Sequence, residues 1–122
     1  MSLVLAFLLL AGYVQAATIT STGTGGVWTA GSSWLGGVAP GANDDAIIVS
    51  GATVTIDAAA VVNNLTINNG GTLIVSGTNT LTVNGSWTNN GIFTANSSTV
   101  VLGGSTDVSF SGNSPSTFYN LT

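Results

Sequence analysis

The sequence has no lysine, arginine or histidine, and its 122 residues include only four acidic residues, all of them aspartate. Nucleic-acid affinity rests largely on Lys and Arg side chains that neutralise phosphates. The composition therefore excludes binding to nucleic acid or to an anionic membrane surface. The absence of cysteine excludes disulfides and thiolate metal sites. Stability must come from hydrogen-bonded ladders and from packing of the 44% of residues that are hydrophobic.

The same absences remove most catalytic groups. General acid–base catalysis needs two titratable groups within reach of one bond, and glycoside hydrolysis needs two carboxyl groups at a defined separation. The acidic residues are Asp44, Asp45, Asp57 and Asp107. Serine and threonine are plentiful but have no partner base. We expect no enzymatic activity and no cofactor.

The N-terminus carries an apolar run at residues 3–11, and Val14-Gln15-Ala16 has a small residue on either side of glutamine. This pattern predicts a signal peptide over residues 1–16, cleaved after Ala16, with a retained hydrophobic arm as the alternative. The run is shorter than the roughly 20 residues that span a bilayer, so a stable membrane span is not expected. We expect an extracellular or cell-surface location.

A short repeat occupies the middle of the chain. Leu65, Leu73 and Leu81 are spaced by eight residues, and each is followed two positions later by Ile or Val and then by a turn residue and Gly. Two apolar residues separated by one residue have the two-residue period of a β-strand. Glycine readily adopts the positive φ that a tight turn requires. Each unit predicts one short strand and one corner.

A longer spacing of about 28 residues relates Leu65 to Phe93 and Leu121, and Leu73 to Val101. A repeat of this length with three short strands predicts an all-β fold, a right-handed parallel β-helix (β-solenoid) in which each coil pairs with the next. Three coils are expected, at residues 34–61, 62–89 and 90–117. The predicted solenoid domain spans residues 34–122.

Residues 17–33 precede the first expected coil and predict an N-terminal cap. An open solenoid end exposes unpaired backbone and apolar side chains, so it needs a cover. Trp28 and Trp34 lie at this point of the chain. The favoured interpretation is that they close the end; the alternative is a platform on which sugar rings stack.

Two polar patterns remain. Asn43, Asp44 and Asp45 follow Pro and Gly, which favours a capped turn; a calcium site is the alternative, although the spaced ligands of a calcium loop are missing. Asparagines recur at expected corners, namely Asn63, Asn64, Asn89, Asn90 and Asn120. They predict a ladder of stacked amides, and the alternative is that asparagine is there only because it favours turns.

The order of these motifs resembles the N-terminal part of large secreted bacterial β-helix proteins, the autotransporter-like and adhesin-like surface proteins. The resemblance rests on Trp34-Leu35-Gly36-Gly37, Pro40 to Asp45, Ile47-Ile48-Val49, Val54-Thr55-Ile56-Asp57, Asn64-Leu65-Thr66-Ile67, Gly71-Thr72-Leu73, Gly91-Ile92-Phe93 and Phe118-Tyr119-Asn120-Leu121. It implies the fold and secretion. It implies little about function, because the same coils serve adhesins, fibres and polysaccharide enzymes.

The segment from Phe118 to Thr122 (Phe118, Tyr119, Asn120, Leu121, Thr122) repeats the start of an earlier coil, which predicts an exposed strand that a second copy pairs with. The leading hypothesis is a secreted, non-enzymatic structural subunit that is its own partner and self-assembles head-to-tail into a filament. The alternative is a glycan-binding adhesin module of a larger surface protein, with the tryptophans or an asparagine-lined face as the binding surface.

Overall fold

The computed structural model describes residues 15–104 and 107–122. The predicted signal peptide, residues 1–16, lies outside the described part except for its last two residues. In the described part, the chain forms short β-strands and one 3-10 turn, η1 (Gly31–Ser33). No helix there is long and apolar enough to cross a bilayer.

The strands form three parallel sheets. The first contains β1 (Thr18–Thr20), β3 (Asp45–Ile48), β6 (Leu65–Ile67), β9 (Trp87–Asn89) and β12 (Phe110–Ser111). The second contains β2 (Gly25–Val27), β4 (Thr53–Ile56), β7 (Thr72–Val75) and β10 (Ile92–Thr94). The third contains β5 (Ala60–Val62), β8 (Thr80–Val83), β11 (Thr99–Leu102) and β13 (Asn120–Leu121).

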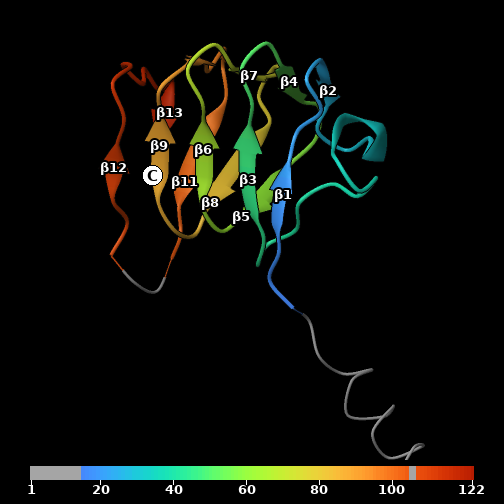
Figure 1. The fold of residues 1–122 in the computed structure, drawn as a ribbon. Coiled ribbons are helices and arrows are strands. Elements are labelled where there is room, and N and C mark those ends of the chain that lie inside the picture. The colour runs from blue at the N-terminus through green and yellow to red at the C-terminus, as the bar shows by residue number, and fades with distance from the viewer. Residues whose placement is uncertain (1–14, 105–106) are drawn as a thin grey trace, which may run out of the picture.

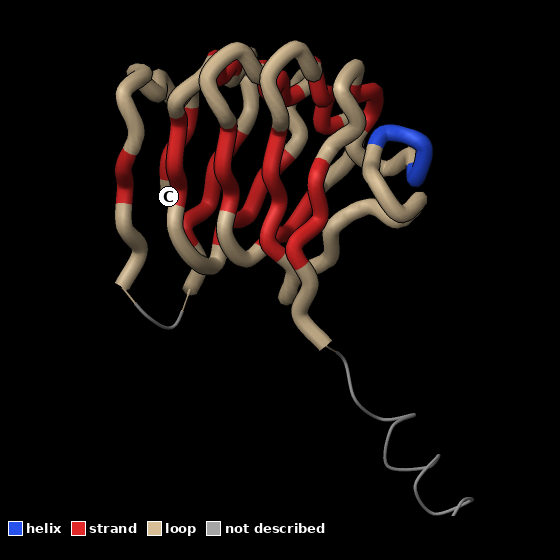
Figure 2. The backbone as a smooth tube through the Cα atoms, in the orientation of Figure 1, coloured by secondary structure: helices blue, strands red, loops and turns tan. Residues whose placement is uncertain are grey.

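The predicted β-solenoid is confirmed (Figures 1 and 2). Each complete coil contributes one strand to each of the three sheets. In Figure 1 the chain rises along the near sheet, passes behind at the top and advances from β1 towards β12. The coil is therefore right-handed, the hand that parallel crossovers almost always adopt. The solenoid has about four turns, where the sequence predicted three.

The predicted coil length is too long for most of the solenoid. Along the first sheet, hydrogen bonds between neighbouring coils join Asp45 to Asn64, 19 residues on, Asn64 to Ser86, 22 residues on, and Thr88 to Ser111, 23 residues on. After the pair β1–β3, the strand registers of this sheet have the same offsets. Those of the other two sheets are similarly short after the first coil. The expected coils at residues 34–61, 62–89 and 90–117 are therefore out of phase with the structure.

The physical reason is that the corners differ in length and several of them are short. Leu65, Leu73 and Leu81 do lie on three successive strands of a single coil, as their spacing of eight predicted. The third corner is shorter, because Trp87 returns to the first sheet six residues after Leu81. Among the strand pairs, the longer spacing that the sequence predicted occurs in the first coil alone, where β1 pairs with β3 and β2 pairs with β4.

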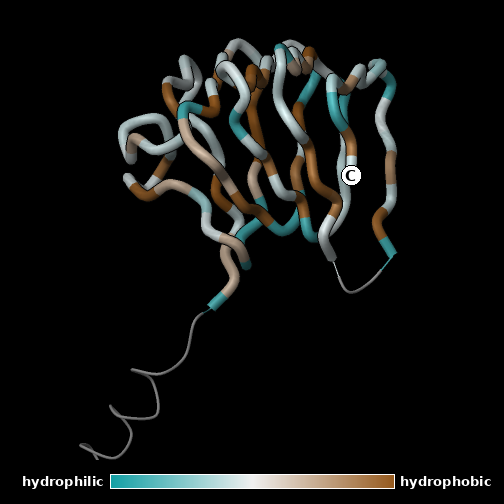
Figure 3. The backbone as a smooth tube through the Cα atoms, turned by 180° about the vertical axis from the view of Figure 1, so that it is seen from behind, coloured by the Kyte–Doolittle hydropathy of each residue, from teal (hydrophilic) through white to brown (hydrophobic). Residues whose placement is uncertain are grey.

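The core is a stack of alternate residues from every coil. Leu65 and Ile67 point inward from β6, and the equivalent residues of β7 and β8 do the same; all are at most 1% exposed. Figure 3 shows hydrophobic stretches of backbone recurring from coil to coil. At about 25 cal/mol per Å² of buried apolar surface, this continuous column supplies the main stabilising free energy.

Residues 28–44 cover the N-terminal end of the column (Figure 1). Their backbone occupies the outer edge of β1: Leu35 N–H donates to the Thr20 carbonyl at 2.8 Å, and Thr22 N–H donates to the Ser33 carbonyl at 2.9 Å. β1 and β2 fall within residues 17–33 yet already belong to the sheets. The solenoid therefore begins before residue 34, and its first coil is long because it contains this cover.

Candidate functional site

The C-terminal end of the solenoid carries a cluster of aromatic rings. Trp87 is buried at its centre, edge-to-face with Phe93 and Phe118 at ring-centroid distances of 4.8 and 5.2 Å. The ring centroids of Phe110 and Trp87 are 6.3 Å apart. The indole N–H of Trp87 donates to Ser116 Oγ at 2.9 Å. Such ring pairs add about 0.5–1.5 kcal/mol each beyond burial, so the cluster orders this end of the core.

Two hydrophobic side chains at this end occupy core positions and are nevertheless exposed. Phe110 pairs in register with Trp87, and Leu121 pairs with Val100. Trp87 and Val100 are at most 1% exposed, whereas Phe110 and Leu121 are each 49% exposed. Within residues 15–104 and 107–122, no strand pairs with β12 or β13 on the outer side. The end of the column is therefore open.

A groove runs beside the free edge of β10. In the described part of the chain, β10 has β7 as its strand neighbour and no strand on its other side. The groove encloses about 340 Å³ and is lined by Phe93, Thr94, Ala95, Asn96, Thr117, Phe118 and Tyr119. A free strand edge beside an apolar groove has the geometry for strand addition, in which backbone bonds hold an added strand and the groove receives its side chains.

The predicted self-association segment, residues 118–122, lies at this end. Phe118 packs inward against the core, whereas Tyr119 is 66% exposed. Asn120 and Leu121 form β13 and pair with β11 on one side, and Thr122 N–H donates to the Val100 carbonyl at 2.9 Å. The segment is thus held by its own chain along one edge and offers only the other edge to a partner.

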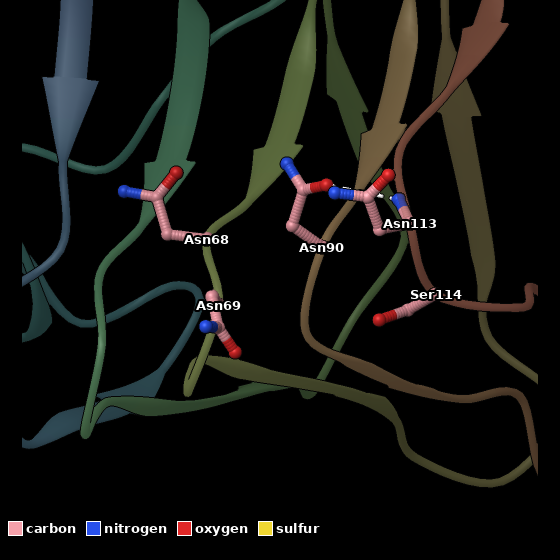
Figure 4. Close-up of a pocket in the computed structure, with 5 residues that line it drawn as sticks. All are labelled: Asn68, Asn69, Asn90, Asn113 and Ser114. Carbon is pink, nitrogen blue, oxygen red and sulfur yellow. Dashed lines mark hydrogen bonds between the residues drawn. The ribbon is translucent and has the colours of Figure 1, made fainter.

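A row of amide side chains runs along one corner of the solenoid, with different members from those predicted. Asn68 follows β6, Asn90 follows β9, and Asn113 follows β12; Figure 4 shows the three side by side. Asn113 N–H donates to Asn90 Oδ1 at 2.9 Å. The predicted partners of Asn90 do not join this row, because the longer spacing behind them was wrong: Asn64 precedes β6, and Asn120 lies in β13 of another sheet.

These amides line a polar hollow that we call the amide pocket. It encloses about 550 Å³ and is lined by Asn68, Asn69, Asn90, Asn113 and Ser114 (Figure 4). Strand alternation turns Asn68 and Asn90 outward, since their neighbours Ile67 and Asn89 are buried. No charged residue lines the pocket.

Asn89 holds the last wall of the amide pocket in place. Its side chain is fully buried, and Nδ2 donates to the Pro115 carbonyl at 2.9 Å and to Ser116 Oγ at 3.1 Å. Oδ1 accepts the Gly91 N–H at 3.0 Å. A buried amide with its donors and acceptor satisfied fixes its neighbours. Asn89 therefore ties the segment after β12 to the preceding coil.

Trp28 and Trp34 lie inside the N-terminal end. They are 3% and 2% exposed, and their rings meet edge-to-face with centroids 4.9 Å apart. The indole N–H of Trp34 donates to the Trp28 carbonyl at 2.9 Å. With both rings packed into the core, neither tryptophan presents a free face on which a sugar could stack.

The carboxylates near residue 44 accept backbone hydrogen bonds. Asp44 accepts the N–H groups of Ala17 and Gly41 at 2.9 and 2.8 Å. Asp45 Oδ1 accepts the Asn64 N–H at 3.1 Å and an Asn63 amide proton at 2.9 Å. Asn43 is exposed beside them. Among the described residues, no three His, Cys, Asp or Glu side chains gather as a metal site would require.

Asp57 links the N-terminal cover to the corner after β4. Its two oxygens accept the Thr29 hydroxyl at 2.5 Å and the Thr29 N–H at 3.1 Å. The hydrogen bond from the Thr29 hydroxyl lowers the pKa of this carboxyl below its ordinary value of 3.8, and the backbone bonds act in the same direction. Asp44, Asp45 and Asp57 thus accept hydrogen bonds that hold the turns and the N-terminal cover in place.

Sequence reasoning missed the aromatic cluster and the membership of the amide row. Asn-Asn-Gly occurs at residues 68–70 and again at residues 89–91, a spacing of 21 that is one residue shorter than the register between β6 and β9. That motif was an available signal for a coil shorter than 28 residues, although it does not give the exact register. The burial of Asn89 had no such signal, because its partners lie 26 and 27 residues further along the chain.

The comparisons with known proteins agree with this architecture. The sequence profile of the G8 domain, a domain found in extracellular proteins, matches residues 33–121. Searches of curated proteins and of solved structures found no match. The expected resemblance therefore holds for an extracellular-type module with a β-solenoid fold, while bacterial origin and an autotransporter or adhesin identity stay predictions. With nearly three quarters of its length matched, this chain belongs to the G8 domain family.

Proposed function

We propose that this chain is a non-enzymatic structural module, secreted or displayed at a cell surface, that associates through the C-terminal end of its solenoid. The observation that carries the proposal is the pair Phe110 and Leu121, which stand at core positions and are each half exposed. Covering them with a further layer of strands continues the buried column and removes apolar surface from water. The groove beside β10 and the exposed ring of Tyr119 extend the same surface.

The partner in this proposal is a second copy of the chain, joined end to end at the C-terminal faces. A head-to-tail filament, the arrangement favoured by the sequence alone, requires the N-terminal end to accept a strand. There the outer edge of β1 is already paired with residues 33–35, and Trp28 and Trp34 are enclosed. Two copies that meet through the same surface form a closed dimer, which does not propagate.

The proposal includes that the chain has no enzymatic activity. Asp44, Asp45 and Asp57 accept hydrogen bonds from turns and from the cover. None of them lines the amide pocket or the groove beside β10. The chain has no histidine, lysine, arginine or cysteine to act as a base or a nucleophile.

Sedimentation equilibrium over a wide concentration range tests the association. The wild-type chain should show a monomer–dimer equilibrium, and Phe110→Ser and Leu121→Ser should each weaken it by about tenfold or more, because each removes an apolar anchor from the centre of the interface. Leu35→Ser is the matched control, since Leu35 is 61% exposed at the opposite end.

Each outcome has a separate meaning. A monomer at every concentration, with the circular dichroism of a folded β protein, contradicts the association. Filaments in negative-stain electron microscopy contradict the closed dimer and favour head-to-tail stacking. Equal weakening by Leu35→Ser and Leu121→Ser places the interface elsewhere.

A glycan-binding module is the second candidate function. Stacking on Trp28 and Trp34 does not support it, because both rings are buried. The observation that favours it is the uncharged amide pocket on the outer face of the solenoid.

A further inference from the structure

We propose that the amide pocket is a binding site for a neutral saccharide chain that lies along the axis of the solenoid. The site is on a side face and does not depend on association through the C-terminal end. The proposal rests on the free hydrogen-bonding groups of the pocket, on their spacing and on the absence of charge.

The pocket has polar groups that the fold leaves free. Within residues 15–104 and 107–122, the side-chain amides of Asn68, Asn69 and Asn113 form no hydrogen bond to another residue, whereas Asn90 Oδ1 holds the Asn113 backbone. Each free amide offers one acceptor oxygen and two N–H donors. Sugar hydroxyls both donate and accept, so each free amide can pair with hydroxyls of one sugar ring.

A row of hydroxyls lies beside the row of amides. Thr66 pairs with Thr88, and Thr88 pairs with Ser111, all two residues before the corresponding asparagine. Thr88 Oγ1 and Ser111 Oγ are 3.0 Å apart. The outer face of the first sheet therefore presents two parallel polar rows, one of hydroxyls and one of amides.

The spacing of the rows suits a repeating ligand. Successive coils are about 4.8 Å apart, so a linear chain of sugar rings running along the axis meets roughly one amide per ring. The pocket lies along a corner of the solenoid, where the backbone N–H groups of Asn68, Asn90 and Ser114 are already hydrogen-bonded within the chain. It therefore does not offer the row of unpaired backbone groups with which an added peptide strand would bind. This position favours a saccharide over a peptide.

The charge of the site selects a neutral ligand. No Lys, Arg or His exists anywhere in the chain, so a uronic acid, sulfate or phosphate group would enter without an ion-pair partner. No aspartate lines the pocket, so a cationic ligand has no partner either. Hexoses and N-acetylated hexosamines remain as the class that fits.

The experiment titrates the ¹⁵N-labelled chain with neutral hexasaccharides, namely cellohexaose, laminarihexaose, mannohexaose and chitohexaose, with an oligogalacturonate as the acidic comparator. We expect at least one neutral probe to shift the side-chain amide signals of Asn68, Asn69, Asn90 and Asn113 in a saturable way. Asn68→Ala and Asn69→Ala should each lower that affinity about three- to tenfold, the loss expected for one or two hydrogen bonds.

Asn43→Ala is the matched control, because Asn43 is exposed and lies outside the pocket; its affinity should equal that of the wild type. The proposal is overturned if no neutral probe gives a saturable shift, if Asn43→Ala weakens binding as much as Asn68→Ala does, or if the oligogalacturonate binds as well as the neutral probes. Asn68 and Asn69 make no side-chain bond within the described fold, so unchanged backbone spectra should accompany both variants.

Discussion

Single residues at the corners set how closely successive coils approach. Gly91 follows Asn89 and Asn90, and its α-carbon lies against the backbone oxygens of Gly71 and Asn68. A β-carbon at Gly91 would lie well inside van der Waals contact with both oxygens. The strand register of the corner therefore depends on this residue having no side chain.

Gly91→Ala should lower the free energy of unfolding by about 1–3 kcal/mol, because the added methyl group forces two coils apart. Urea denaturation followed by tryptophan fluorescence measures the loss. Gly23→Ala is the control, since a β-carbon at Gly23 meets no atom within 4 Å; it should change stability by less than about 0.5 kcal/mol. Equal effects of the two substitutions would contradict the close approach at Gly91.

Asp57 makes stability depend on pH. The Thr29 hydroxyl holds the folded-state pKa of this carboxyl below its ordinary value of 3.8. A group whose pKa is depressed by folding stabilises the fold fully above its unfolded value, and this contribution is lost as the pH falls through the folded pKa. Unfolding free energy measured from about pH 6 down to about pH 2 should fall more steeply in the wild type than in Asp57→Asn. Parallel curves would show that the contact does not form in solution.

At the scale of elements, the N-terminal cover formed by residues 28–44 contributes side chains to the core. Trp34→Ala removes an enclosed ring, its edge-to-face contact with Trp28 and the hydrogen bond to the Trp28 carbonyl. The loss in unfolding free energy should be about 3–5 kcal/mol, the range for a buried aromatic residue replaced by alanine. Leu35→Ala, next in the chain and 61% exposed, should stay within about 0.5 kcal/mol of the wild type. A small effect at Trp34 would mean that the ring is not enclosed in solution.

Individual strands also show how far the sequence alone could go. The alternation around Leu65, Leu73 and Leu81 was enough to predict three strands per coil and the solenoid. β9 was missed because its inward residues are Trp87 and Asn89, and a buried asparagine does not look like a core residue. Without β9 in the first sheet, the predicted coil is longer than the observed one.

The prediction of the candidate sites depended on the predicted coil length. A ladder of amides was expected, and a row of amides exists, but its members could be identified only with the correct coil length. The C-terminal strand was expected to be exposed; its outer edge and Leu121 are exposed while its other edge is paired with β11. Partners that are distant in sequence, such as Asn89 and Pro115, have no local signature.

At the scale of the whole molecule, the lack of cationic side chains is the most unusual feature of the composition. With no Lys, Arg or His, it has no ion pair between side chains to screen, and its four carboxylates are too few for strong self-repulsion. The urea midpoint should therefore be almost unchanged when NaCl is raised. Sodium sulfate should raise the midpoint, because excluded salts strengthen apolar burial. A steep dependence on NaCl would contradict a fold held by ladders and packing alone.

The unequal ends of the solenoid also lead us to expect a direction of folding. The covered end is the N-terminal one, so the part of the molecule that emerges first during synthesis can close itself with Trp28 and Trp34 before any later coil exists. Each following strand then meets a partner about 20 residues behind it, a short distance for a parallel sheet. Growth by addition to an existing edge removes the need to nucleate each sheet anew. We expect a solenoid built this way to add its strands in order, from the covered end towards β12 and β13.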